Sequence, residues 1–178
     1  MTNAPWASIE DFRDIESLNH YAEAVAGGQD PGEVLDVLRG RSRDNARTPM
    51  QWDASAHAGF TDGTPWLPVN PNHTEINAEA ARKDPDSVFH HYRRLIEMRH
   101  VLPVVVHGDY RLLLPDDEQV FAYVRTLDGT KLTVLANLSG AAAGVPQLAG
   151  EVVISTHGRA SPPSELAPWE GLAVLLRS

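Results

Sequence analysis

Residues 120–137 read VFAYVRTLDGTKLTVLAN, two β-rich runs separated by a short polar stretch. The runs from Val120 to Thr126 and from Lys131 to Asn137 follow the two-residue period of β-strands. Asp128-Gly129 lies between them, and this dipeptide is typical of a two-residue hairpin turn. The stretch therefore predicts a pair of antiparallel strands and an antiparallel β domain built around them.

The rest of the chain after Pro103 has the same character. Short β-rich segments bounded by turn residues predict four more strands, at Val104 to His107, Tyr110 to Leu114, Glu151 to Ser155 and Leu172 to Leu176. Together with the hairpin they predict a small antiparallel all-β domain, a β-sandwich, over residues 103–178.

The first hundred residues predict helices instead. Ser8 and Asp11 have the spacing of a capping box and predict the start of a first helix, which ends at Gly27-Gly28. Asp30-Pro31 combines a cap with proline at the first helical position and predicts a second, short helix that ends at Gly40.

A third helix is predicted from residue 85 to residue 99. Asp84 is expected to cap it, Pro85 takes the first position, and Leu102-Pro103 ends it. Its apolar positions follow helical spacing and are Val88, Phe89, Tyr92, Leu95 and Ile96.

The segment from Arg41 to Pro71 shows neither period and contains several prolines and glycines, so it predicts a long loop. Loops of this length in a compact domain are usually functional. Trp52, Phe60 and Trp66 lie in it. Because a disordered linker is poor in aromatic residues, we expect these side chains to pack the loop rather than to stack on the rings of a ligand.

Composition excludes several classes of function. The formal net charge of -9 argues against nucleic acid as a partner. No cysteine is present, the eight histidines show no metal spacing, and no apolar run is long enough to span a membrane. We therefore expect no metal, no cofactor and no membrane partner. Residues 1–6 lack the pattern of a signal peptide, so the expected compartment is cytoplasmic.

A specific series of motifs lies in and beside the loop. Residues 43–53 read RDNARTPMQWD, and further matches follow in order at Ala58-Gly59-Phe60, Pro65-Trp66, Val69 to Asn72, and Ile76-Asn77. The series closely resembles oligo-1,6-glucosidases and related α-glucosidases of the α-amylase superfamily, glycoside hydrolase family 13. The resemblance covers the chain from residue 1 to about Asn137.

The resemblance implies an α+β fragment. Residues 1–102 would form the end of a catalytic (β/α)8 barrel, with its eighth βα loop and its last helix from Asp84 to His100, followed by the C-terminal β-sandwich domain. In such barrels the loops after the strands build the active site. The barrel strands themselves would be absent from this chain, so a missing barrel segment is an expected partner.

Three substrate-binding residues are carried over from the family. Arg43 matches an arginine that holds the hydroxyls of the terminal glucose, and Glu16 matches a glutamate that lines the second sugar site. A guanidinium can donate two parallel hydrogen bonds to vicinal hydroxyls. The alternatives are an ion pair of Arg43 with Asp44 or Glu16, and a surface charge for Glu16. Arg47 is as well suited to stabilising the loop as to touching sugar.

No catalytic residue is assigned. Retaining glycosidases need two carboxyl groups about 5 to 5.5 Å apart, and the family motifs that carry them are not found here. The expected function is the C-terminal part of an α-glucosidase that hydrolyses terminal α-glucosidic bonds of small oligosaccharides, inactive alone. The alternatives are a non-catalytic structural or sugar-binding β module, and a fragment of a trehalose synthase or sucrose isomerase.

Overall fold

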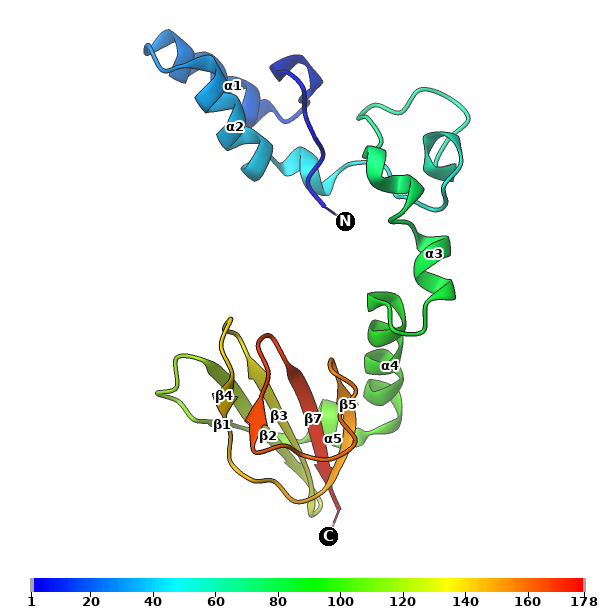
Figure 1. The fold of residues 1–178 in the computed structure, drawn as a ribbon, viewed down its shortest axis with the longest axis vertical. Coiled ribbons are helices and arrows are strands. Elements are labelled where there is room, and N and C mark those ends of the chain that lie inside the picture. Colours follow the sequence, from blue (N-terminus) through cyan, green and yellow to red (C-terminus); the bar gives the residue numbers. More distant parts are fainter. Residues whose placement is uncertain (1, 178) are drawn as a thin grey trace. The chain divides into compact units, whose positions relative to one another are not determined.

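The computed structural model describes residues 2–177, and the chain divides into two compact units, residues 1–89 and 90–178 (Figure 1). The first unit is built from helices, turns and the long loop. The second unit contains the β-strands. Each unit has its own apolar core and is described by itself.

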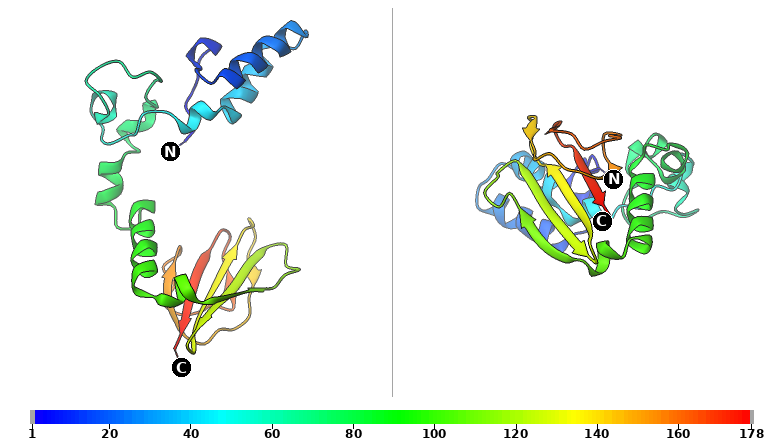
Figure 2. Two further views of the ribbon diagram at one scale, coloured as in Figure 1. Left: turned by 180° about the vertical axis from the view of Figure 1, so that it is seen from behind. Right: turned by 90° about the horizontal axis from the view of Figure 1, so that it is seen from below.

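Two helices of the first unit lie side by side, α1 (Ile15–Ala26) and α2 (Pro31–Arg41) (Figures 1 and 2). The predicted start of α2 is confirmed, because the Asp30 carboxylate accepts from the backbone N–H groups of Gly32 and Glu33. The helix continues through Gly40, where we expected it to end.

The start expected for the first helix was wrong. Ser8 precedes only a single 3-10 turn, Ile9–Asp11, in which the Asp11 carboxylate accepts from the Ser8 N–H. The chain then returns to extended backbone, and α1 begins after Asp14. A capping box satisfies the first N–H groups of any helical turn, so it does not decide whether the turn continues.

The segment from residue 42 to residue 77 is a loop with short 3-10 turns at Arg43–Ala46, Ala56–Gly59 and Pro71–Thr74. It is followed by a short helix, α3 (Ala78–Lys83), which the sequence reading missed. Its residues, AEAARK, carry no apolar period, and its only local signal is Asn77, whose side chain accepts from the Ala80 N–H.

The expectation that the aromatic side chains pack the loop was wrong. Trp52, Phe60 and Trp66 are 52%, 46% and 56% exposed. Polar groups and buried aliphatic side chains hold the loop instead. The buried Gln51 amide donates to Ile76 O at 2.6 Å and to Asn72 Oδ1 at 2.9 Å. Leu67 is fully buried in the core of this unit.

The third predicted helix is present as α4 (Val88–Val101), but its predicted start was wrong. Asp84 ends α3 instead of capping α4, and Pro85 lies in a turn before the helix. Several of its apolar side chains are exposed to solvent. Val88, Tyr92 and Ile96 are each more than half exposed. The strand expected at Val104 to His107 was wrong, because these residues belong to a short helix, α5 (Pro103–His107). Proline favours the first turn of a helix, and that preference outweighs the strand propensity of three valines.

The β unit contains a five-stranded antiparallel sheet in the order β1-β2-β3-β7-β5. The strands are β1 (Asp109–Leu113), β2 (Val120–Leu127), β3 (Thr130–Asn137), β5 (Glu151–Ser155) and β7 (Gly171–Leu176). Two short strands that were not predicted, β4 (Ala143–Gly144) and β6 (Glu165–Leu166), form a second small sheet. The predicted hairpin turn is confirmed, because Asp128 and Gly129 both have positive φ values.

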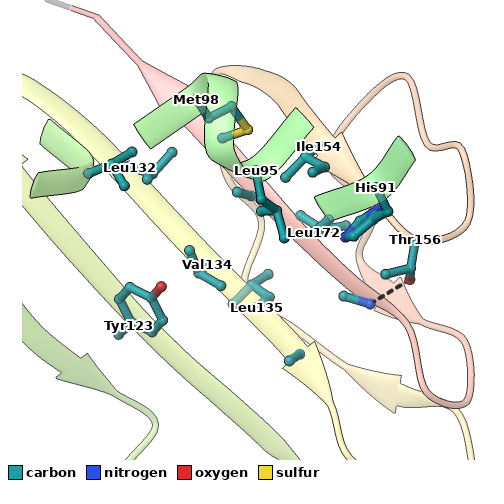
Figure 3. Close-up of a pocket in the computed structure, with 14 residues that line it drawn as sticks. His91, Leu95, Met98, Tyr123, Leu132, Val134, Leu135, Ile154, Thr156 and Leu172 are labelled. Carbon is teal, nitrogen blue, oxygen red and sulfur yellow. Dashed lines mark hydrogen bonds between the residues drawn. The ribbon is translucent and has the colours of Figure 1, made fainter. Parts of the chain in front are cut away.

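The large sheet is covered on both faces, which completes the predicted all-β domain. On one face the buried residues of β2, β3 and β7 pack against Ala143 and Leu166 of the small sheet. On the other face Leu132, Ala173 and Leu175 pack against Val104 of α5. Figure 3 shows an apolar cavity of about 230 Å³ on this second face, where Leu95 and Met98 of α4 lie over the sheet.

A buried ion pair fixes the loop before β7. The Arg159 guanidinium donates to both carboxylate oxygens of Glu170, at 2.8 and 2.9 Å, and the Ala167 N–H donates to the same carboxylate at 2.8 Å. Glu170 is fully buried. These hydrogen bonds, the Arg159 contact foremost, hold the pKa of Glu170 below its ordinary value although burial acts in the opposite direction.

We expect Glu170→Gln to lower the free energy of unfolding of the β unit by roughly 1.5 to 3 kcal/mol, because the amide cannot accept both charge-assisted hydrogen bonds. Since the folded-state pKa is lowered, this contribution is present above the pKa of unfolded glutamate and is lost as the pH falls through the folded value. Thermal melts from pH 3 to pH 7 test this, with the exposed Glu151→Gln as control. Equal melts of Glu170→Gln and wild type at neutral pH would contradict it.

Candidate functional site

Arg43 and Glu16, two of the residues carried over from the family, meet in the first unit. Arg43 opens the 3-10 turn after α2, and its Nη2 donates to Oε2 of Glu16 at 2.9 Å, across 27 residues of sequence. The same Nη2 lies 3.1 Å from Oδ1 of Asp14. The alternative of an ion pair with Glu16 is thus present in the structure, whereas within residues 2–177 the Asp44 carboxylate pairs with Arg47 and not with Arg43.

The buried Asp44 side chain holds this arrangement through hydrogen bonds. The sequence indicated no site role for Asp44 itself. Its carboxylate is fully buried. Oδ2 accepts from the backbone N–H groups of Arg13 at 2.7 Å and Asp14 at 2.9 Å, and Oδ1 accepts from Nη2 of Arg47 at 2.5 Å. The loop after α2 is therefore tied to the residues that precede α1. The only sequence signal was the place of Asp44 inside RDNARTPMQWD.

Asp14 lies between the two arginines. It is 4% exposed and accepts a hydrogen bond from the Ser17 hydroxyl, whose oxygen lies 2.9 Å from Ser42 Oγ and can accept the Ser42 hydroxyl proton. Burial raises the pKa of Asp14, but the Ser17 hydroxyl and the Arg43 guanidinium outweigh it and hold the pKa below its ordinary value. Asp14 is therefore a carboxylate anion at neutral pH.

Arg47 stabilises the loop, which is one of the two roles that the sequence left open for it, the other being contact with sugar. Besides its contact with Asp44, its Nη2 lies 3.9 Å from Oδ1 of Asp14. Its guanidinium carbon lies 5.3 Å from the ring centroid of Trp66, which is a cation–π distance. The three residues Arg43, Glu16 and Arg47 thus belong to one polar cluster that is organised by Asp14 and Asp44.

The cluster borders a cavity of about 260 Å³ between α1 and the end of α2. Asp14, Glu16, His20, Arg41 and Arg43 line it, so both hydrogen-bond donors and acceptors face the space. Among the described residues, Nε and Nη1 of Arg43 have no hydrogen-bond partner, and they remain available to a ligand. Such a mixture of fixed donors and acceptors suits a polyhydroxylated molecule.

Within residues 2–177, no three histidine or acidic side chains are grouped so that they could hold a metal ion. In the same part of the chain, no helix has the length and apolar character needed to cross a membrane.

Comparison with known proteins gives the class of the chain. Residues 11–108 match the family described as "Alpha amylase, catalytic domain", and residues 108–173 match a domain of unknown function, DUF3459. The chain thus combines part of an α-amylase-type catalytic domain with a β domain.

Relatives agree with this class. The chain is 54% identical over 140 residues to an oligo-1,6-glucosidase of Parageobacillus thermoglucosidasius, covering 78% of this chain and 25% of the relative. It is 46% identical to a trehalose-6-phosphate hydrolase of Bacillus subtilis, with 79% and 25% covered.

Solved structures agree as well. The crystal structure of Bacillus licheniformis trehalose-6-phosphate hydrolase superposes with a TM-score of 0.90 at 38% identity, covering all of this chain and 34% of that one. The trehalulose synthase of Pseudomonas mesoacidophila gives 0.88 at 40% identity, with 98% and 33% covered.

The chain therefore belongs to the α-amylase family, glycoside hydrolase family 13, as the motif at residues 43–53 indicated. It spans about a quarter of the length of the curated relatives it matches.

We expect Asp44→Ala to lower the free energy of unfolding of the first unit by about 3 to 5 kcal/mol, because it leaves two N–H groups and Arg47 without their buried acceptor. Urea unfolding followed by circular dichroism measures the change. Asp36→Ala removes an exposed ion pair with Arg39 and should leave the transition almost unchanged. If the two variants unfolded alike, the organising role of Asp44 would be refuted.

Proposed function

We propose that this chain supplies sugar-binding residues to an α-glucosidase that acts on terminal α-glucosidic bonds of small oligosaccharides. The observation that carries the proposal is the convergence of Arg43 and Glu16 at one cavity. Their convergence fits the roles that the family resemblance gives them. The ligand is an α-glucoside oligosaccharide.

The geometry supports sugar hydroxyls as the ligand of Arg43. The guanidinium is held at Nη2 by two carboxylates, which fixes its orientation and leaves Nε and Nη1 to donate. These remaining N–H groups lie in the guanidinium plane but point in different directions, so each can donate to a separate sugar hydroxyl. The Glu16 carboxylate, which is 78% exposed, can accept from a hydroxyl of the same ligand.

The charges at the cavity favour a neutral sugar over a phosphorylated one. Arg41 and Arg43 are balanced by Asp14 and Glu16, so no excess of positive charge faces a phosphate group. The higher identity to the oligo-1,6-glucosidase than to the trehalose-6-phosphate hydrolase agrees with this choice.

Catalysis requires carboxyl groups from outside this cluster. A retaining mechanism needs one carboxyl that is protonated near neutral pH, and such a group has a raised pKa. The pKa of Asp14 is lowered instead. A carboxyl group with a lowered pKa is deprotonated near neutral pH and is a poor proton donor to a leaving group, so we propose that the chain alone does not hydrolyse glucosides.

The missing groups would come from a barrel segment, and α4 offers a surface for it. Val88, Tyr92 and Ile96 are spaced four residues apart on this helix and are 73%, 63% and 53% exposed. Apolar side chains at this spacing form one helix face, and burying each would contribute roughly 1.5 to 3 kcal/mol. A barrel segment that covers this face would gain that energy.

We expect the purified chain to leave p-nitrophenyl α-glucoside and isomaltose unchanged, and co-expression with the complementary barrel segment of the Parageobacillus thermoglucosidasius relative to give turnover. Tyr92→Asp should weaken the assembly, whereas a change at the exposed Lys83, Lys83→Asp, should not. Turnover by the chain alone, retained after repurification, would contradict the proposal.

Because one solved relative is a trehalulose synthase, sucrose is assayed beside these substrates, and isomerised sucrose would favour that second activity.

In the assembled protein, Arg43→Ala is expected to lower kcat/KM by roughly tenfold to a hundredfold, because sugar hydroxyls lose a charged donor. The melting temperature should hardly move, since the side chain is 64% exposed and its ion pairs face solvent on one side. Arg43→Lys should recover little, because an ammonium group lacks the planar fork. Steady-state kinetics beside thermal melts measure both quantities. A large fall in melting temperature with unchanged kinetics would make Arg43 a structural residue.

A further inference from the structure

Trp66 is a large aromatic side chain held at the surface beside the Arg43 cluster. It is 56% exposed, although the next residue, Leu67, is fully buried. The backbone that carries the indole is thus anchored in the core of the unit while the ring itself faces outward. An exposed indole on an anchored backbone offers a large apolar area, with a polar N–H group, in a fixed place.

One face of the indole is already occupied. The Arg47 guanidinium carbon lies 5.3 Å from the ring centroid, and Arg47 is itself held by the buried Asp44 carboxylate. Asp44 therefore holds Arg47, and Arg47 in turn contacts one face of the Trp66 ring. This chain of contacts restrains the ring. The side chain is still 56% exposed, which leaves area for contact with a ligand.

Trp66 is linked to Arg43 through Arg47 and Asp14. Oδ1 of Asp14 lies 3.9 Å from Nη2 of Arg47 and 3.1 Å from Nη2 of Arg43. The two guanidinium groups thus lie near the same carboxylate oxygen. Arg43 borders the cavity, and Arg47 lies over the indole ring. These linked contacts are the reason to consider a ligand that extends from Arg43 toward Trp66.

From this arrangement we propose that Trp66 is an aromatic subsite that stacks on the apolar face of a pyranose ring of the same oligosaccharide. The subsite rests on the proposed function, because Arg43 is taken to bind the neighbouring ring. The face of an indole carries negative charge density, and the C–H groups on one side of a pyranose ring carry positive partial charge. Stacking of the two also removes apolar area from water. The ligand class is a neutral pyranose disaccharide or longer.

Tryptophan fluorescence tests the subsite on the chain itself. The reporter is the double variant Trp52→Phe, Trp169→Phe, which keeps Trp66 and the buried Trp6. Maltose and isomaltose are titrated while acrylamide quenching is measured. Both sugars should protect Trp66 from quenching in a saturable way. Sorbitol, which offers hydroxyls but no pyranose face, should not.

Three further variants in this reporter separate the possible results, with sugar binding measured by calorimetry. Trp66→Ala should raise Kd for the disaccharides by roughly threefold to tenfold and leave Kd for glucose nearly unchanged. Arg43→Ala should weaken both. Lys83→Ala is the control. Binding that depends on Arg43 but not on Trp66 would overturn the subsite and leave the proposed function standing. Absence of saturable, Arg43-dependent binding would overturn both.

Discussion

The buried carboxylate of Asp44 is the contact on which the candidate site depends. It satisfies two backbone N–H groups just before α1 and one guanidinium from the loop after α2, so it joins two segments that lie about 30 residues apart. A charge without these partners would be costly in the interior. The start of α1 and the position of the Arg43 turn are therefore set by the same group.

The contacts of Asp44 indicate that the motif at residues 43–53 has mainly a structural role. Most of its polar residues build the loop. Asn45 accepts from Ala4 N and from Trp6 Nε1, and Gln51 donates to Asn72 and Ile76. Arg43 is the residue whose guanidinium faces the cavity. A motif that is specific enough to indicate a family thus consists largely of residues that hold the loop together.

The sequence predicted those parts of the fold that local rules decide. The hairpin at Asp128-Gly129, the cap at Asp30 and the period-two strands all depend on neighbours in sequence. It failed at α5, where Pro103 outweighed three valines, and at α3, which has no apolar face. The ion pair of Arg43 with Glu16 was only one of the alternatives that the sequence left open. It depends on where α1 begins. Asp44 fixes that start through a contact between distant parts of the chain, which local sequence patterns cannot predict.

The central claim is that Arg43 uses its free donors to bind sugar hydroxyls while Asp14 and Glu16 hold its other end. Nitrogen-15 NMR of the arginine side chains during an isomaltose titration tests it most directly. The account predicts that the Nε–H signal of Arg43 shifts in a saturable way, while that of Arg93, which pairs with Glu97 on α4, stays in place. Saturable shifts elsewhere in the protein with the Arg43 signal unmoved would contradict the account.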